Sequence, residues 1–149
     1  MPEANRRLWH WRVGSGRRKL RVYFYSQTVV WQLTHREKLK QKVADLAVER
    51  VRSHPENQVT LGIGTGSTAD RFIQSLKAIR HRVDTTVSSS ERSASMLRDM
   101  GFSVTDLNAV PRVHIYVDGA DEVDKNLNLI KGGGGAHTNE KRLAKIANQ

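Results

Sequence analysis

The chain has 149 residues, no cysteine and a formal net charge of +10 at pH 7. This length suffices for one domain with a hydrophobic core. The lack of cysteine excludes disulfides, thiolate catalysis and cysteine zinc sites, and it fits the cytoplasm. No apolar run approaches the length of about 18 residues that indicates a membrane span, so we expect no membrane contact.

The positive charge is concentrated at the start of the chain. Residues 1–33 hold seven Lys or Arg residues against one acid, Glu3, and contain all three tryptophans. The composition changes sharply near Thr34, and we place a boundary between residues 1–33 and 34–149 there. Three interpretations of the first segment remain open: a disordered or unrelated extension, a targeting peptide, and an arm that binds nucleic acid. We favour the first, so nucleic acid is not the expected partner.

Patterns typical of helices and strands alternate after this boundary. Thr34 and Glu37 match a capping box, which predicts a helix that begins there and ends before Pro55. The apolar stripe of this helix consists of Leu39, Val43, Leu46, Ala47 and Val51. A short strand over 59–63 follows, and then a helix whose buried positions are Ala69, Phe72, Ile73, Leu76 and Ile79.

The alternation continues to the end of the chain. Residues 83–87 are β-rich, and Ser88 with Glu91 matches a second capping box, which predicts a helix that Gly101 ends. Strand candidates lie at 102–105, 113–117 and 126–130, and another helix begins at Thr138. This order predicts an α/β fold with a doubly wound, mostly parallel, Rossmann-like sheet. Because Gln149 falls inside a predicted helix, we expect this sheet to be incomplete.

A loop rich in glycine and hydroxyl groups joins the strand at 59–63 to the helix after it. Free N–H groups and the helix dipole favour an anion there, so a phosphate monoester is the expected ligand. The residues that would bind it are Thr65, Gly66, Ser67 and Thr68. The loop also matches the pattern G-x-G-x-x-G/A, which makes a dinucleotide-binding oxidoreductase the alternative. Asp84, its ribose-binding candidate, stands near the start of a strand instead of its end, which weakens this alternative.

Three carboxylates and one ammonium gather around a second glycine-rich turn. Asp118 and Asp121 follow a predicted strand, Lys131 precedes four glycines, and Glu140 lies in the first turn of the last helix. The glycine N–H groups can converge as a nest, and acids with a cation in one crevice suit proton transfer. Taken singly, each residue fits an ordinary structural role, but the joint arrangement favours a site.

Residues 39–149 resemble the ribose-5-phosphate isomerases of type A. The segments that carry the resemblance are 62–68, 88–90, 116–122 and 131–141, in the order of that family. The resemblance implies an enzyme of the pentose phosphate pathway that interconverts ribose 5-phosphate and ribulose 5-phosphate without a metal or an organic cofactor. It also implies a homo-oligomer when full length, and a small second α+β domain that this chain lacks. We therefore expect the 149-residue chain alone to have poor stability and little activity.

The resemblance further implies a role for each site residue. Glu140 would be the base that moves a proton between C2 and C1, and Lys131 would stabilise the enediolate oxygen. Asp118 would help to open the sugar ring, and Asp121 would hold substrate hydroxyls. Substrate contacts are also implied for Lys40 and for three glycines: Gly132, Gly133 and Gly134. Removing a weakly acidic C–H proton requires such a base and a nearby positive group.

Overall fold

The computed structural model describes residues 27–149, and side chains from Thr34 onwards. Residues 37–149 form one compact unit. The three interpretations of residues 1–33 therefore fall almost entirely outside the described residues, and the boundary at Thr34 remains a prediction. The elements are α1 (Gln27–Arg52), β1 (Val59–Ile63), α2 (Ser67–Leu76), η1 (Lys77–Arg82), β2 (Val83–Ser88), α3 (Glu91–Asp99), η2 (Leu107–Ala109), β3 (Ile115–Val117), β4 (Glu122–Val123), β5 (Leu129–Ile130) and α4 (His137–Ile146).

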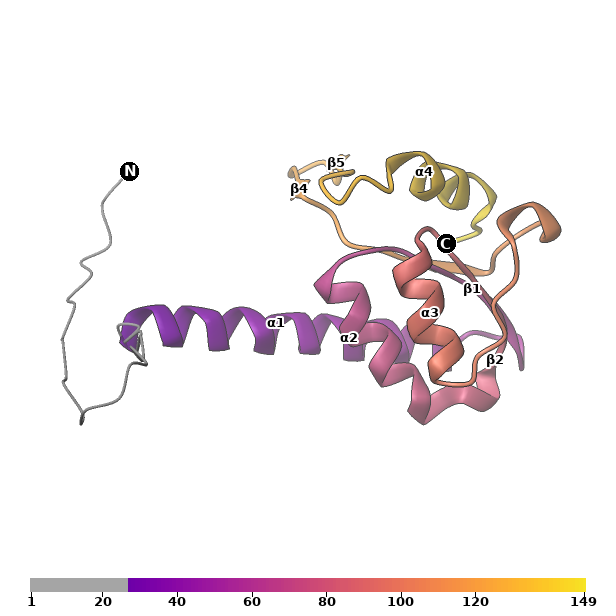
Figure 1. The fold of residues 1–149 in the computed structure, drawn as a ribbon, viewed down its shortest axis with the longest axis horizontal. Coiled ribbons are helices and arrows are strands. Elements are labelled where there is room, and N and C mark those ends of the chain that lie inside the picture. The colour runs from indigo at the N-terminus through magenta and orange to yellow at the C-terminus, as the bar shows by residue number, and fades with distance from the viewer. Residues whose placement is uncertain (1–26) are drawn as a thin grey trace, which may run out of the picture. The chain divides into compact units, whose positions relative to one another are not determined.

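Three parallel strands in the order β2-β1-β3 form the main sheet, which confirms the predicted α/β class. Helices α2 and α3 lie on one side of this sheet and α4 on the other (Figure 1). Leu61, Ile63 and Ile115 face the larger core, where they pack with residues of α1, α2 and α3. Val87 of β2 and Tyr116 of β3, both opposite Gly62 of β1, belong to the smaller core with Leu143 of α4. The alternation of strand side chains thus places helices on both faces.

The strand at 59–63 and the buried face of α2 were predicted correctly. All five expected apolar positions from Ala69 to Ile79 are at most 2% exposed. The apolar face expected for α1 was partly wrong. Val51 is buried and Ala47 packs against the core as expected, but Leu39, Val43 and Leu46 are 49–63% exposed, and Ala44 and Val48 are buried in their place.

The two predicted capping boxes were wrong. Helix α1 begins at Gln27, so Thr34 lies inside it. The N-cap of α3 is Ser90, whose side chain accepts the N–H of Ser93, and not Ser88. The Ser88 hydroxyl instead donates to the carbonyl of Ser90 at 2.8 Å.

Two strand candidates are shorter than the sequence indicates. Residues 102–105 contribute only an isolated bridge between Val104 and Thr86. Residues 126–130 contribute β5, which pairs antiparallel with β4 outside the main sheet. Leu127 has φ of 65°, and this left-handed turn separates β5 from the residues before it. Within residues 27–149, no helix has the length and hydrophobicity to cross a membrane.

Candidate active site

The loops that follow β1, β2 and β3 meet at one edge of the sheet. Because the strands are parallel, their carboxyl ends lie together, and backbone hydrogen bonds join the loops there. Gly64 N–H donates to the carbonyl of Val117 at 2.9 Å, and Ser89 N–H donates to that of Ile63 at 2.9 Å. The loop at 62–69 and the turn at Asp118 are therefore neighbours, as the sequence predicted.

Lys131 lies between two of the predicted carboxylates. Its Nζ is 2.8 Å from Asp118 Oδ2 and 3.5 Å from Glu140 Oε2, and it also donates to the carbonyl of Gly119. The side chains of Asp118 and Glu140 are 7% and 5% exposed, and that of Lys131 is 23% exposed. Such burial strengthens the attraction of the ammonium for both acids.

The two oxygens of Glu140 differ in their contacts. Oε1 accepts a hydrogen bond of 2.8 Å from the Thr65 hydroxyl. Oε2 is buried and makes no hydrogen bond within the described part of the chain. The Thr65 hydroxyl, predicted as a phosphate ligand, thus contacts the candidate base. Because Oε1 is held, Oε2 is the oxygen that is left to accept a proton.

Asp118 is held more tightly than Glu140. Its Oδ1 accepts N–H groups from Thr65 at 3.2 Å and from Gly119 at 2.7 Å. Its Oδ2 accepts the Tyr116 hydroxyl in addition to the ammonium. A Cβ at Gly64 would lie 2.0 Å from Asp118 Oδ1, so this glycine leaves room for the carboxylate.

Asp121 contacts the glycine turn instead of Lys131. Its Oδ2 accepts the N–H of Gly133 at 2.9 Å, and a Cβ at Gly133 would lie 2.8 Å from Asp121 Oδ1. Gly132 has φ of 102°, which favours glycine. A Cβ at Gly134 would lie 3.5 Å from Thr65 Oγ1, so the glycine run borders the loop after β1.

The other predicted phosphate ligands surround the start of α2. Gly66 precedes the helix with φ of 96°, and a Cβ there would meet nothing within 4 Å. No side chain caps the helix, and the side chain of Ser67 is exposed while that of Thr68 is half-exposed. First-turn N–H groups of an α-helix have no partner inside the helix. Open space beside them leaves room for an anion.

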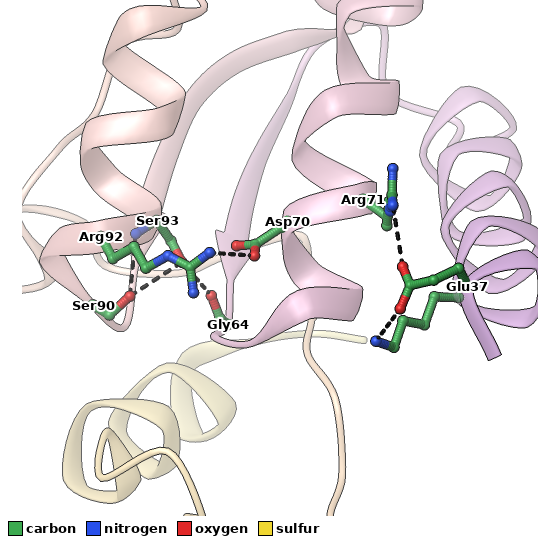
Figure 2. Close-up of polar contacts among 8 residues, drawn as sticks. Glu37, Gly64, Asp70, Arg71, Ser90, Arg92 and Ser93 are labelled. Atoms are coloured by element: carbon green, nitrogen blue, oxygen red, sulfur yellow. Dashed lines mark hydrogen bonds and ion pairs between the residues drawn. The ribbon is translucent and has the colours of Figure 1, made fainter. Parts of the chain in front are cut away.

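Lys40 is bound by a residue that the sequence analysis did not select. Its ammonium is 2.7 Å from Glu37 Oε1, and Arg71 of α2 is 3.1 Å from Glu37 Oε2 (Figure 2). Lys40, followed by Arg71, lowers the pKa of Glu37. Lys40 is thus ion-paired with Glu37 in this structure and, among the described residues, makes no hydrogen bond to the hydroxyls of the loop.

Residues of helix α3 contact the loop that follows β1 and the helix α2 after it (Figure 2). The buried Ser93 hydroxyl donates to the carbonyl of Gly64 at 2.9 Å. Arg92 pairs with Asp70 of α2 at 2.6 Å. The sequence analysis did not select Ser93, Arg92 or Asp70 as residues near the site. The one pattern that pointed to this region was the run of serines before α3.

The geometry also bears on the dinucleotide alternative and on metals. Asp84 is exposed and lies near the amino end of β2, whereas the loop after β1 lies beside the carboxyl end. It is therefore badly placed for a ribose bound at that loop. Among residues 27–149, no three acidic or histidine side chains converge to hold a metal ion.

Comparisons with known proteins show which family the chain resembles. Residues 85–149 match the family described as ribose 5-phosphate isomerase A (phosphoriboisomerase A). Ribose-5-phosphate isomerase A of Bordetella pertussis is 54% identical over 115 residues, which are 77% of this chain and 50% of that protein. The crystal structure of ribose 5 phosphate isomerase A from Neisseria gonorrhoeae aligns with a TM-score of 0.68 and 43% identity, over 74% of this chain and 48% of that one.

A D-ribose-5-phosphate isomerase in complex with phospho-erythronic acid aligns with a TM-score of 0.68 and 33% identity, over 76% of this chain and 49% of that one. The chain spans about half the length of the relatives that it matches. Over that half, it belongs to the ribose 5-phosphate isomerase A family.

Proposed function

We propose that this chain carries the catalytic residues of an isomerase that interconverts D-ribose 5-phosphate and D-ribulose 5-phosphate. The observation that carries the proposal is the ammonium of Lys131 between two buried acids, one of which, Glu140, has an oxygen that accepts no hydrogen bond among the described residues. An aldose–ketose isomerisation needs a base beside C2 and a positive charge beside the carbonyl oxygen. Membership of the family supports this choice of substrate.

In the proposed reaction, Glu140 Oε2 removes the proton from C2 of the open-chain aldose. The C–H electrons form the C1=C2 bond, and the carbonyl electrons move to the oxygen on C1, where Lys131 stabilises the negative charge. Glu140 then returns the proton to C1, while the proton of the C2 hydroxyl passes to the oxygen on C1. No atom is gained or lost, and no cofactor is required.

The phosphate would bind where α2 begins. First-turn N–H groups and the hydroxyls of Ser67 and Thr68 would contact it. Lys40 would join them by leaving Glu37. The structural relative in complex with phospho-erythronic acid supports a phosphorylated sugar derivative as the ligand class. The homo-oligomer and the cytoplasmic location remain predictions.

The proposal is tested by incubating the 149-residue chain with ribose 5-phosphate in D₂O. Ribulose 5-phosphate is the expected product, and deuterium at C1, detected by proton NMR, should appear in the fraction of turnovers in which Glu140 exchanges its proton with the solvent before returning it. Glu140→Gln, which keeps the shape of the side chain, should lower turnover by about 10²–10⁴-fold and leave sugar-phosphate binding largely intact. Lost binding with normal turnover per bound substrate would contradict the assigned role.

Two further measurements separate the alternatives. Tight binding of NAD without any response to ribose 5-phosphate would favour the dinucleotide interpretation. Deleting residues 1–33 should leave isomerisation unchanged, whereas the nucleic-acid interpretation requires that this deletion abolish function.

A further inference from the structure

Asp118 has no free acceptor site in this structure. A carboxylate offers about four lone-pair sites. Two backbone N–H groups, those of Thr65 and Gly119, occupy Oδ1, and the Lys131 ammonium and the Tyr116 hydroxyl occupy Oδ2. Three of these four donors are backbone groups or the candidate catalytic ammonium. The fourth, Tyr116, has no role in the proposed reaction and needs an explanation.

Tyr116 is fixed by the sheet. It lies on β3 opposite Gly62 of β1. A Cβ at Gly62 would lie 2.9 Å from Tyr116 Cδ2, so the ring passes over this glycine. Its backbone N–H also donates to the carbonyl of Gln149 at 2.8 Å. A ring held in this way presents its hydroxyl from one direction only.

The environment also keeps the Tyr116 hydroxyl protonated. Burial raises its pKa most, followed by the hydrogen bond to Asp118 and the negative charges of Asp118 and Glu140. The phenol therefore remains a donor throughout the neutral pH range. Unlike a titrating group, it can hold a carboxylate at every pH at which the enzyme would work.

We propose that Tyr116 is a positioning residue that fixes Asp118, and through it the Lys131 ammonium, beside Glu140. This inference rests on the proposed function in one respect, which is that the positioning serves the isomerisation reaction. Without the hydroxyl, Oδ2 would keep Lys131 alone, and the carboxylate would be restrained by three partners instead of four. The ammonium also contacts Gly119 and Glu140, so its place would become less defined.

The test compares Tyr116→Phe with the control Thr86→Val in the 149-residue chain. Both substitutions remove one hydroxyl with little change of shape. Thr86 is fully buried on β2 and donates to the carbonyl of Ser103 at 2.7 Å, away from the acids. Carbon-13 NMR of the Asp118 carboxyl group, without substrate, reports on its hydrogen bonds and is independent of any activity.

Tyr116→Phe should shift the Asp118 carboxyl signal, and it should lower kcat for ribose 5-phosphate about tenfold with KM within about twofold. Thr86→Val should change neither. If Tyr116→Phe leaves the Asp118 carboxyl signal unchanged, the inference is overturned. If the parent chain is active and Tyr116→Phe leaves its kcat unchanged, the inference is overturned as well. A shifted signal in a chain that cannot isomerise ribose 5-phosphate supports the positioning and refutes the proposed function instead.

A second variant covers the case in which Tyr116→Phe does not fold. Asp118→Asn removes the carboxylate charge while Tyr116 keeps its ring and hydroxyl. Alkaline titration of the tyrosine absorbance should then show a lower Tyr116 pKa than in the parent chain, since Asp118 contributes to raising it. An unchanged Tyr116 pKa would show that the two groups do not interact and would overturn the inference.

Discussion

A methyl group at Gly64 tests the packing on which the site is built. In Gly64→Ala, the new Cβ would lie 2.0 Å from both Cγ and Oδ1 of Asp118, whereas ordinary contacts begin at 3.4 Å. The carboxylate must therefore retreat by about 1.4 Å. It cannot do so freely, because it accepts two backbone N–H groups, a phenol and an ammonium.

The expected losses of stability and of turnover follow from that displacement of the carboxylate. Overpacking alone costs about 1–3 kcal/mol. In a domain of this size this corresponds to a Tm lower by about 5–15 °C. Moving the carboxylate also moves the Lys131 ammonium, and a misplacement of about 1 Å can lower turnover by about 100-fold.

Thermal unfolding followed by circular dichroism measures the first effect, and ribose 5-phosphate turnover measures the second. Gly119→Ala is the control for stability, since a Cβ there would meet nothing within 4 Å in the same turn. Its Tm should stay within about 3 °C of the parent value. A parent-like Tm for Gly64→Ala would show that Asp118 moves aside without cost, and the reasoning would be refuted.

Three other predictions concern the phosphate loop, a charged cluster and the core. Replacing Ser67 and Thr68 by Ala should weaken the binding of ribose 5-phosphate by about tenfold or more and leave the binding of ribose unchanged. Calorimetry measures both affinities. Equal losses for the two sugars would argue against a phosphate loop. Because Glu37 has a lowered pKa, its ion pairs contribute stability above its unfolded pKa and lose it as pH falls through the folded value. The Tm difference between the parent chain and Glu37→Gln should therefore shrink on acidification, and a difference that is independent of pH would contradict this. Leu143→Ala, at a fully buried position of α4, should cost about 2–5 kcal/mol in urea unfolding, while Leu46→Ala on the exposed face of α1 should cost under about 1 kcal/mol.

The sheet and its loops could be predicted because their signals are local. The strand at 59–63 is apolar and is bounded by polar residues and glycine, and the buried positions of α2 recur with the helical period. Once the strands are parallel, Gly64 and Asp118 must follow them at the same edge. No long-range information was needed for this step.

The N-cap of α3, the buried face of α1 and the contact between Tyr116 and Asp118 could not be predicted, because the local sequence pattern allows more than one solution for each. Ser88 and Ser90 are both good N-caps, and the one selected depends on where the chain leaves β2. Helix α1 has apolar residues on more than one face, and packing against α2 places Ala44 inward and Val43 outward. The contact between Tyr116 and Asp118 depends on the register of β3 against β1, which sets the ring over Gly62.

In the sequence, Asp118 and Glu140 look equivalent, since both are acids near the same lysine. The structure separates them by the donors that each one meets. Asp118 accepts three hydrogen bonds and pairs with the Lys131 ammonium, so any proton it took would displace a donor or a cation that holds the turn together. Glu140 accepts one hydrogen bond on Oε1, while Oε2 is buried without a hydrogen bond among the described residues and is 3.5 Å from the ammonium. An oxygen that accepts no hydrogen bond can take a proton without displacing a donor. Proton transfer at Glu140 and anchoring at Asp118 are therefore the division of roles that this arrangement favours.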